Sequence, residues 1–182
     1  MSADNDQVAG SWDVDHVPLR DGEAVASQAA IAGHPMHPML IPFPIALLIF
    51  TLLADVLFAV TADEFYARMG RWTLATGLAT GALAGAVGLI DFVSLKRPRQ
   101  LSAGWIHAIG NGVVLALGAI SLYGRFLAGE DFIVPWGLAL SAIVGLLLAL
   151  TGWYGGELSY RHLIGVDPRH DEDQRPTRTR VE

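Results

Sequence analysis

Histidine and acidic side chains are the residues of this sequence whose chemistry could form a site. Six of them lie near the ends of long apolar segments: His34, His37, Asp91, His107, Glu157 and His162. Imidazole and carboxylate groups together bind zinc, iron, copper or manganese, and two histidines on facing helices bind haem iron axially. The spacing of these residues specifies neither a metal ion nor haem. All six are therefore candidate metal ligands, and His34, His37 and His107 are candidate haem ligands.

Four apolar segments must position these side chains. A bilayer core is about 30 Å thick, so a helix that rises about 1.5 Å per residue needs roughly 20 apolar residues to cross it. Segments 42–60, 72–95, 104–126 and 134–156 meet that length. Of the 182 residues 52% are hydrophobic and 16% are charged, which is too apolar for an ordinary soluble domain. The sequence predicts an all-α integral membrane four-helix bundle with short loops.

The two ends of the chain differ from this apolar middle. Segments 1–29 and 167–182 are polar and lack sustained periodicity, so we expect flexible tails on either side of a domain at 30–166. The acidic start lacks the basic and apolar stretches of a secretory signal, and the first helix is expected to be a retained anchor. No internal repeat is evident in the sequence.

Basic residues predict how the bundle sits in the membrane. Four crossings place both ends and the loop after the second helix on one side. That side carries nine of the twelve Lys and Arg residues, and the other carries Arg68, Arg71 and Arg125. The positive-inside rule then places both termini in the cytoplasm. In this orientation the six candidate ligands share the cytoplasmic face, and ionisable groups gathered at membrane helices often mark a site.

Helical spacing indicates which polar groups face other helices. Four glycines form a stripe along the second segment, at Gly77, Gly81, Gly85 and Gly88. Asp91 continues this stripe, and Asn111 shares the face of His107 four residues earlier. Small-residue stripes let helices approach closely, which fits packing within one chain or a homodimer interface. Glu157 could instead form an ordinary ion pair with Arg161.

Several other chemistries find no support in the sequence. The chain has no cysteine, so disulfides, thiolate metal sites and thiol catalysis are excluded. A formal net charge of −6 argues against nucleic-acid binding. No serine lies in a G-x-S-x-G elbow, and no segment resembles the interrupted helices of transporters. Asp55 stands alone in the first helix, where we expect it to cap or to be solvated.

Two motifs carry a resemblance to a known family. The sequence Gly-His-Pro-Met-His-Pro at 33–38 precedes Ile-Pro-Phe-Pro at 41–44, and Gly-Trp-Tyr-Gly-Gly-Glu-Leu occupies 152–158. With an Asp ending the second segment and a His opening the third, they resemble a bacterial family of predicted membrane proteins classed as a domain of unknown function. The resemblance covers about 32–166 and implies a four-helix inner-membrane domain with site positions at the six candidate ligands. Members joined to cytochrome-like or Rieske-type modules imply electron transfer.

Two functional hypotheses follow. In the first, the chain is a haem- or metal-binding electron-transfer module in which His107 and one of His34 or His37 are the ligands and Asp91 orients one of them. We expect no attached redox domain, so the module would need a separate redox partner. In the second, the chain is a structural or interaction protein without catalytic function, and the polar cluster only fixes the packing of the helix ends.

Overall fold

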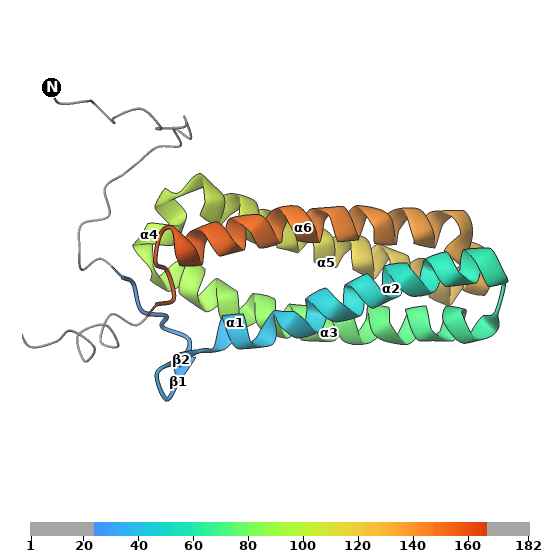
Figure 1. Ribbon diagram of the computed structural model, residues 1–182, viewed down its shortest axis with the longest axis horizontal. Helices are drawn as coiled ribbons and strands as arrows, with labels where there is room; N and C mark the ends of the chain where they lie inside the picture. The colour runs from blue at the N-terminus through green and yellow to red at the C-terminus, as the bar shows by residue number, and fades with distance from the viewer. Residues whose placement is uncertain (1–23, 167–182) are drawn as a thin grey trace, which may run out of the picture.

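Four long helices form an antiparallel bundle in the computed structural model, which describes residues 24–166 (Figure 1). They are α2 (Pro42–Thr61), α3 (Glu64–Ser94), α5 (Ser102–Ala128) and α6 (Leu138–Tyr160). Within these described residues, three continuous helical runs are long and apolar enough to cross a membrane, and the third, Ser102–Tyr160, contains both α5 and α6. The predicted all-α membrane bundle is confirmed. The predicted tails lie mostly outside the described residues, at 1–23 and 167–182.

Helix boundaries depart from the prediction where charges or proline occur. α3 begins at Glu64 rather than at residue 72, because Arg68 lowers the local hydropathy without breaking the helix. The side chain of Asp63 caps α3 by accepting a hydrogen bond from the backbone N of Phe65 at 2.8 Å. α6 begins later than predicted, because Val134 has an extended backbone (φ −117°, ψ 121°) immediately before a proline.

Short elements connect the long helices. They are β1 (Ala30–Ile31), β2 (His34–Pro35), α1 (Met36–Leu40), α4 (Lys96–Gln100), η1 (Gly129–Phe132) and η2 (Ile133–Gly137). β1 and β2 form a two-stranded antiparallel hairpin before α1. α4 joins α3 to α5, and the irregular turns η1 and η2 join α5 to α6.

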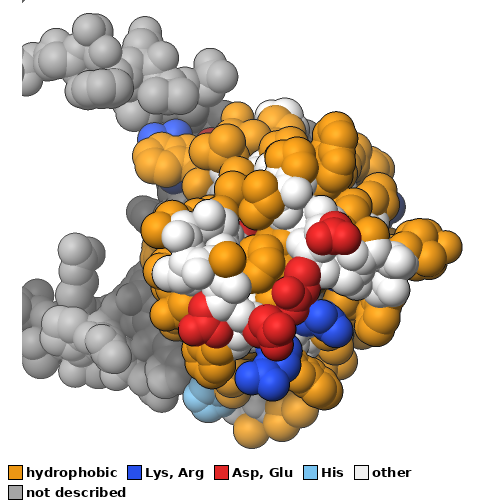
Figure 2. All heavy atoms as spheres, turned by 90° about the vertical axis from the view of Figure 1, so that its right-hand side faces the viewer, with side chains coloured by type: hydrophobic (Ala, Val, Ile, Leu, Met, Phe, Trp, Pro, Cys, Tyr) orange, Lys and Arg blue, Asp and Glu red, His pale blue; other side chains and the backbone are white. Residues whose placement is uncertain are grey.

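The two ends of the bundle are chemically different. α1 and α4 lie at one end, which we call the histidine end, and the α2–α3 and α5–α6 turns lie at the other, which we call the acidic end (Figure 1). Figure 2 looks onto the acidic end, where Asp and Glu side chains gather beside basic ones within a hydrophobic surround. At the histidine end the backbone N of Val25 donates to O of Leu163 at 3.0 Å. Both ends of the described chain therefore lie at the histidine end, as an even number of crossings requires.

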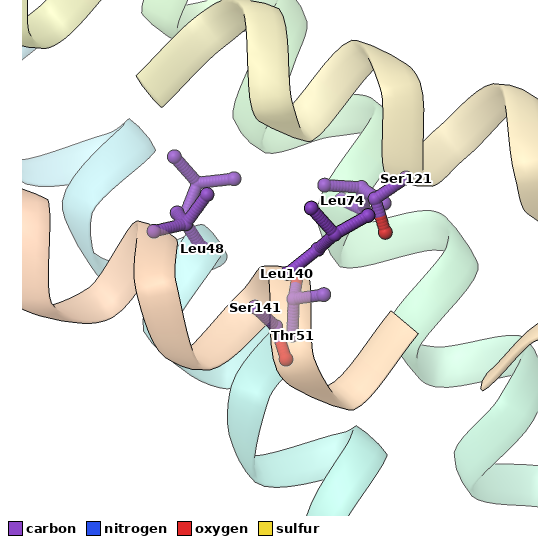
Figure 3. Close-up of a pocket in the computed structure, with 7 residues that line it drawn as sticks. Leu48, Thr51, Leu74, Ser121, Leu140 and Ser141 are labelled. Atoms are coloured by element: carbon purple, nitrogen blue, oxygen red, sulfur yellow. The ribbon is translucent and has the colours of Figure 1, made fainter. Parts of the chain in front are cut away.

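Hydrophobic side chains from all four helices fill the middle of the bundle. This core consists of Leu48, Leu74, Val114, Val144 and Leu148. Beside it lies a void lined by Leu48, Thr51, Leu74, Ser121, Leu140, Ser141 and Val144 (Figure 3). The void has room for roughly one water molecule, so it is far too small for a macrocyclic cofactor.

Candidate functional site

His37 and His107 meet at the histidine end of the bundle. His37 lies in α1, and His107 lies near the start of α5. The centroids of their imidazole rings are 6.0 Å apart, and the ring planes are nearly perpendicular, at 86°. Both side chains are half-buried. The structure thus brings together two of the three predicted haem ligands, from segments 70 residues apart. We call these two residues the histidine pair.

Each imidazole of the histidine pair is oriented by a backbone carbonyl of a neighbouring helix. Nδ1 of His37 lies 2.9 Å from O of Ala84 in α3, and Nδ1 of His107 lies 2.9 Å from O of Thr151 in α6. A carbonyl oxygen only accepts, so each Nδ1 carries the proton and donates it. The neutral ring then has its lone pair on Nε2, as a metal ligand requires. Within residues 24–166, neither Nε2 atom takes part in a hydrogen bond.

Asn111 supports the placement of His107. Its Nδ2 donates to the backbone O of His107 at 2.8 Å, and its Oδ1 accepts from Oγ1 of Thr151 at 3.4 Å. Nδ2 of Asn111 also approaches Nδ1 of His107 to 3.4 Å, but both groups are donors once Nδ1 is bonded to the carbonyl. We therefore assign the bond at Nδ1 to Thr151.

Glycines make room for both rings. A Cβ atom at Gly88 of α3 would lie 2.7 Å from Nδ1 of His37, and one at Gly155 of α6 would lie 2.8 Å from Cε1 of His107. Contacts this short do not occur in proteins, so any other residue would displace the ring. The absence of a side chain lets each imidazole lie directly against helix backbone.

The spacing of the histidine pair suits a shared ligand. A metal lies about 2.0–2.1 Å from a ligating nitrogen, which is about 1.1 Å from the ring centroid, so two imidazoles on one ion have centroids about 5.1 Å apart at a tetrahedral angle and about 6.3 Å apart when opposite each other. The observed 6.0 Å falls within this range, and it also falls within the range of about 4.5–7 Å for two rings in direct edge-to-face contact. The donor set fits a transition metal or haem iron, both of which accept neutral imidazole.

Asp91 contacts the segment that precedes His37, and not the imidazoles. Its carboxylate accepts from Oγ of Ser27 at 2.6 Å and from the backbone N of Gln28 and Ala29 at 2.7 and 3.0 Å. The backbone O of Ala29 accepts in turn from N of Met36, the residue before His37, at 2.9 Å. Asp91 thus holds in place part of the segment that the sequence assigns to the tail.

The remaining candidate ligands lie apart from the histidine pair. His34 is exposed, and its Nδ1 bonds to O of Ala32 at 3.0 Å. Glu157 forms a surface ion pair with Arg161 at 3.7 Å, and the backbone N of His162 donates to O of Glu157. Across the described part of the chain, no group of three or more His, Asp or Glu side chains could hold a metal ion. The histidine pair is therefore the part of the candidate set that the structure assembles.

The glycine stripe of α3 faces other helices of the same chain. A Cβ at Gly77 would lie 3.1 Å from Leu48 of α2, and one at Gly81 would lie 2.9 Å from Leu115 of α5. Gly88 faces His37, whereas Gly85 is exposed with nothing closer than 3.9 Å. Most of the stripe thus packs within the chain.

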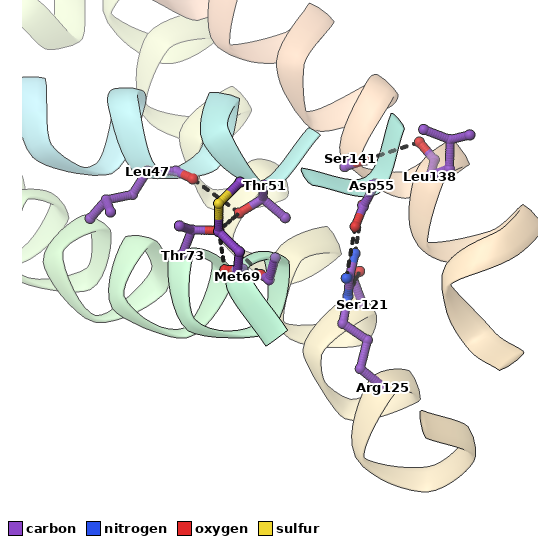
Figure 4. Close-up of polar contacts among 10 residues, drawn as sticks. Leu47, Thr51, Asp55, Met69, Thr73, Ser121, Arg125, Leu138 and Ser141 are labelled. Atoms are coloured by element: carbon purple, nitrogen blue, oxygen red, sulfur yellow. Dashed lines mark hydrogen bonds and ion pairs between the residues drawn. The ribbon is translucent and has the colours of Figure 1, made fainter. Parts of the chain in front are cut away.

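A buried ion pair near the acidic end was missed from the sequence. Nη1 and Nη2 of Arg125 in α5 donate to the two carboxylate oxygens of Asp55 in α2 at 2.8 and 2.6 Å (Figure 4). Both side chains are 1% exposed. The prediction of a lone, capping or solvated Asp55 is wrong, and Arg125 belongs to the interior rather than to the surface charge of that side. Two opposite charges at similar depth in different apolar segments were the signal available.

Residues of α2, α3, α5 and the turn η2 enclose this ion pair. Nε of Arg125 approaches Oγ of Ser121 to 3.4 Å on the same helix. A Cβ at Gly70 of α3 would lie 3.2 Å from Oδ1 of Asp55, and one at Gly137, just before α6, would lie 3.1 Å from Nη2 of Arg125. The two carboxylate oxygens and three guanidinium nitrogens all have partners, so the pair forms a closed unit.

Comparison with family models gives one finding that bears on identity. A model described as a predicted membrane protein, DUF2231, matches residues 33–168. Neither curated proteins nor solved structures give a match. The matched region contains all the long helices and the histidine pair. With three helical runs able to cross a membrane and most of its length matched, the chain belongs to the DUF2231 family of predicted membrane proteins.

Proposed function

We propose that this protein is a membrane module that binds haem or a transition-metal ion through His37 and His107 and takes part in electron transfer. The observation that supports this most is the pair of Nδ1 bonds to backbone carbonyls, 2.9 Å each, which leaves both Nε2 lone pairs available. A bound haem or redox metal would supply one-electron chemistry. The chain itself orients the two ligands.

The surroundings of the histidine pair support a ligating role. Gly88 and Gly155 fix how closely each ring lies to its neighbouring helix. Asp91 holds the segment that leads into His37, so it positions a ligand without touching it. Such outer interactions fix the tautomer and orientation of metal-bound histidines. Electrons would be exchanged with a separate redox partner protein.

Spectroscopy of detergent-purified protein tests the proposal. We expect either a Soret band or one transition metal per chain by elemental analysis, before or after reconstitution with haem or metal. The variants His37→Ala and His107→Ala should lose this Soret band or this bound metal. His34→Ala is the matched control, because His34 is an exposed histidine of the same segment. Wild-type protein that takes up neither haem nor a metal would refute the proposal.

A structural role is the second candidate, and one observation favours it. Among the described residues, every buried polar side-chain atom has a hydrogen-bond partner, so the network is complete without a ligand. Hydrogen bonds between membrane helices contribute about 0.6–2 kcal/mol each. On this reading His107→Ala lowers the melting temperature of the protein but changes neither its spectrum nor its metal content.

We also propose that the histidine end faces the cytoplasm of a bacterial inner membrane. Three basic residues of α4, Lys96, Arg97 and Arg99, lie at this end, and the positive-inside rule favours that side. The chain contains no cysteine, so one cysteine introduced at a time reports the side directly. In intact cells, a membrane-impermeant thiol reagent should label a cysteine at Ala62 and leave one at Gln100 unlabelled. The reverse pattern would overturn the orientation.

A further inference from the structure

In the two helical hairpins of the bundle, residues with the same structural role occur at corresponding positions. His107 follows His37 by 70 residues, and Arg125 follows Asp55 by the same 70. Each of these pairs is in direct contact across the bundle. The buried hydroxyl of Ser121 likewise follows that of Thr51 by 70 residues. α5 thus repeats the order of side-chain roles found in α1 and α2.

The second helix of each hairpin repeats in the same way. The carbonyl of Thr151 that binds one imidazole follows that of Ala84 by 67 residues, and Gly155 follows Gly88 by 67. Gly137 follows Gly70, its counterpart beside the ion pair, by the same number. The change from 70 to 67 means that the chain between equivalent positions is three residues shorter in the second hairpin, although its turn, which contains η1 and η2, has more residues outside the long helices.

Burial follows the same correspondence. Buried positions on α3 at Leu74, Gly77 and Gly81 match buried positions on α6 at Ser141, Val144 and Leu148. The contacts between helices follow the same correspondence, in which α5 is equivalent to α2 and α6 to α3. α3 packs beside α5, and the equivalent pair α6 and α2 also packs together. Amino-acid identity between the halves is low, which explains why the sequence showed no repeat.

Contacts between equivalent residues locate a symmetry axis. In a two-fold arrangement, a residue that touches its own equivalent must lie on the axis. Two such pairs, His37 with His107 and Asp55 with Arg125, lie near opposite ends of the bundle. The axis therefore runs along the bundle, and related repeats with an axis along the membrane normal occur in other membrane proteins.

We infer that the chain is a fused pair of equivalent hairpins, Met36–Ser94 and Ser102–Tyr160, whose pseudo-two-fold axis passes through the histidine pair and makes its two imidazoles equivalent ligands of one site. Gly88 and Gly155 are then equivalent positioning residues. The ligand assignment rests on the proposed function, whereas the symmetry does not. A ligand with two equivalent coordination positions, such as haem iron or a linear two-coordinate metal, matches such a site.

Exchanging the ion pair tests the symmetry without any ligand. In the double variant Asp55→Arg/Arg125→Asp, an arginine at 55 would find the hydroxyl of Thr51 where Arg125 now finds that of Ser121. Each single variant places like charges in contact and should lose about 10 °C or more of melting temperature, or fail to fold. The exchange should recover most of this loss. An exchange variant no more stable than the single variants would overturn the symmetry.

Alanine at the positioning glycines tests the equivalence of the ligands. In 15N NMR of the ligand-free protein, Gly88→Ala should shift the imidazole signals of His37, and Gly155→Ala those of His107. With hemin as the probe, both variants should lose its low-spin absorption spectrum to a similar degree. Gly85→Ala and Gly152→Ala are matched controls, since they are also 67 residues apart and a Cβ meets no atom closer than 3.9 Å at either.

The two experiments separate the inference from the proposed function. Failure of wild-type protein to bind hemin, together with a successful exchange, would leave the symmetry standing and remove haem as the ligand. Imidazole shifts in only one glycine variant, or hemin loss in only one, would show that the two ligands are not equivalent.

Discussion

The two polar regions on the bundle axis satisfy their side chains in opposite ways. The pair of Asp55 and Arg125 is 1% exposed, and its charges neutralise each other through two short hydrogen bonds. The histidine pair is half-buried and bonds to backbone carbonyls, which leaves two nitrogen lone pairs unused. A fully paired ion pair of this kind stabilises the bundle, whereas a region with unused nitrogen lone pairs has atoms available to bind a ligand. Burial of charge alone therefore does not distinguish a candidate binding site from a structural ion pair.

The largest expected effect comes from breaking the closed unit on one side. Arg125→Met leaves Asp55 buried without a partner and should cost about 3–5 kcal/mol of unfolding free energy. Replacing both partners, as Asp55→Leu/Arg125→Met, should restore most of it, because two apolar side chains carry no desolvation penalty. Thermal unfolding of the three proteins in one detergent measures this. A double variant as unstable as the single one would show that the pair does more than neutralise charge.

A smaller effect is expected from the histidine pair. His107→Ala removes its hydrogen bond to Thr151, which should cost about 1–2 kcal/mol. The same variant should abolish haem or metal uptake, whereas Arg125→Met should leave uptake intact in the fraction that folds. Parallel measurement of melting temperature and bound ligand distinguishes the two regions. If both variants lost bound haem or metal equally, the loss of ligand would reflect unfolding of the protein and not removal of a ligating residue.

Asp91→Asn tests the support of the histidine end. The amide keeps the shape of the carboxylate but offers one acceptor oxygen for three donors, so about 1–3 kcal/mol of local stability should be lost. Amide hydrogen exchange of Gln28 and Ala29 should accelerate, while amides near Asp55 should not change. Unchanged exchange at Gln28 would contradict the assigned role of Asp91.

The smallest effect is expected at the surface pair of Glu157 and Arg161. These side chains are 24% and 58% exposed, and their nearest charged atoms are 3.7 Å apart. Such a pair contributes about 0–0.5 kcal/mol. Glu157→Gln should therefore leave both melting temperature and ligand uptake unchanged. A loss of bound ligand in this variant would show that Glu157 belongs to the binding site.

Hydropathy was enough to predict the helices, because lipid demands long apolar segments whatever their partners. It also placed the histidines at a common depth. Depth alone does not determine which residues a side chain contacts, however. Those contacts also depend on the direction of the side chain around its helix axis and on which helices are neighbours. This is why His37 was distinguished from His34, and Asp91 from the histidine pair, only once α3 and α6 were placed. Asp55 was misread for the same reason, since its partner lies 70 residues away.

The ion pair has a consequence for how the chain is made. The first hairpin carries Asp55, and the arginine that neutralises it arrives only with α5. An uncompensated charge costs up to about 2.5–3.5 kcal/mol at the centre of a bilayer and less near its surface. During synthesis the first hairpin therefore carries this cost until the second one joins it. Neither half should persist alone, and expressing the two halves together should rescue both.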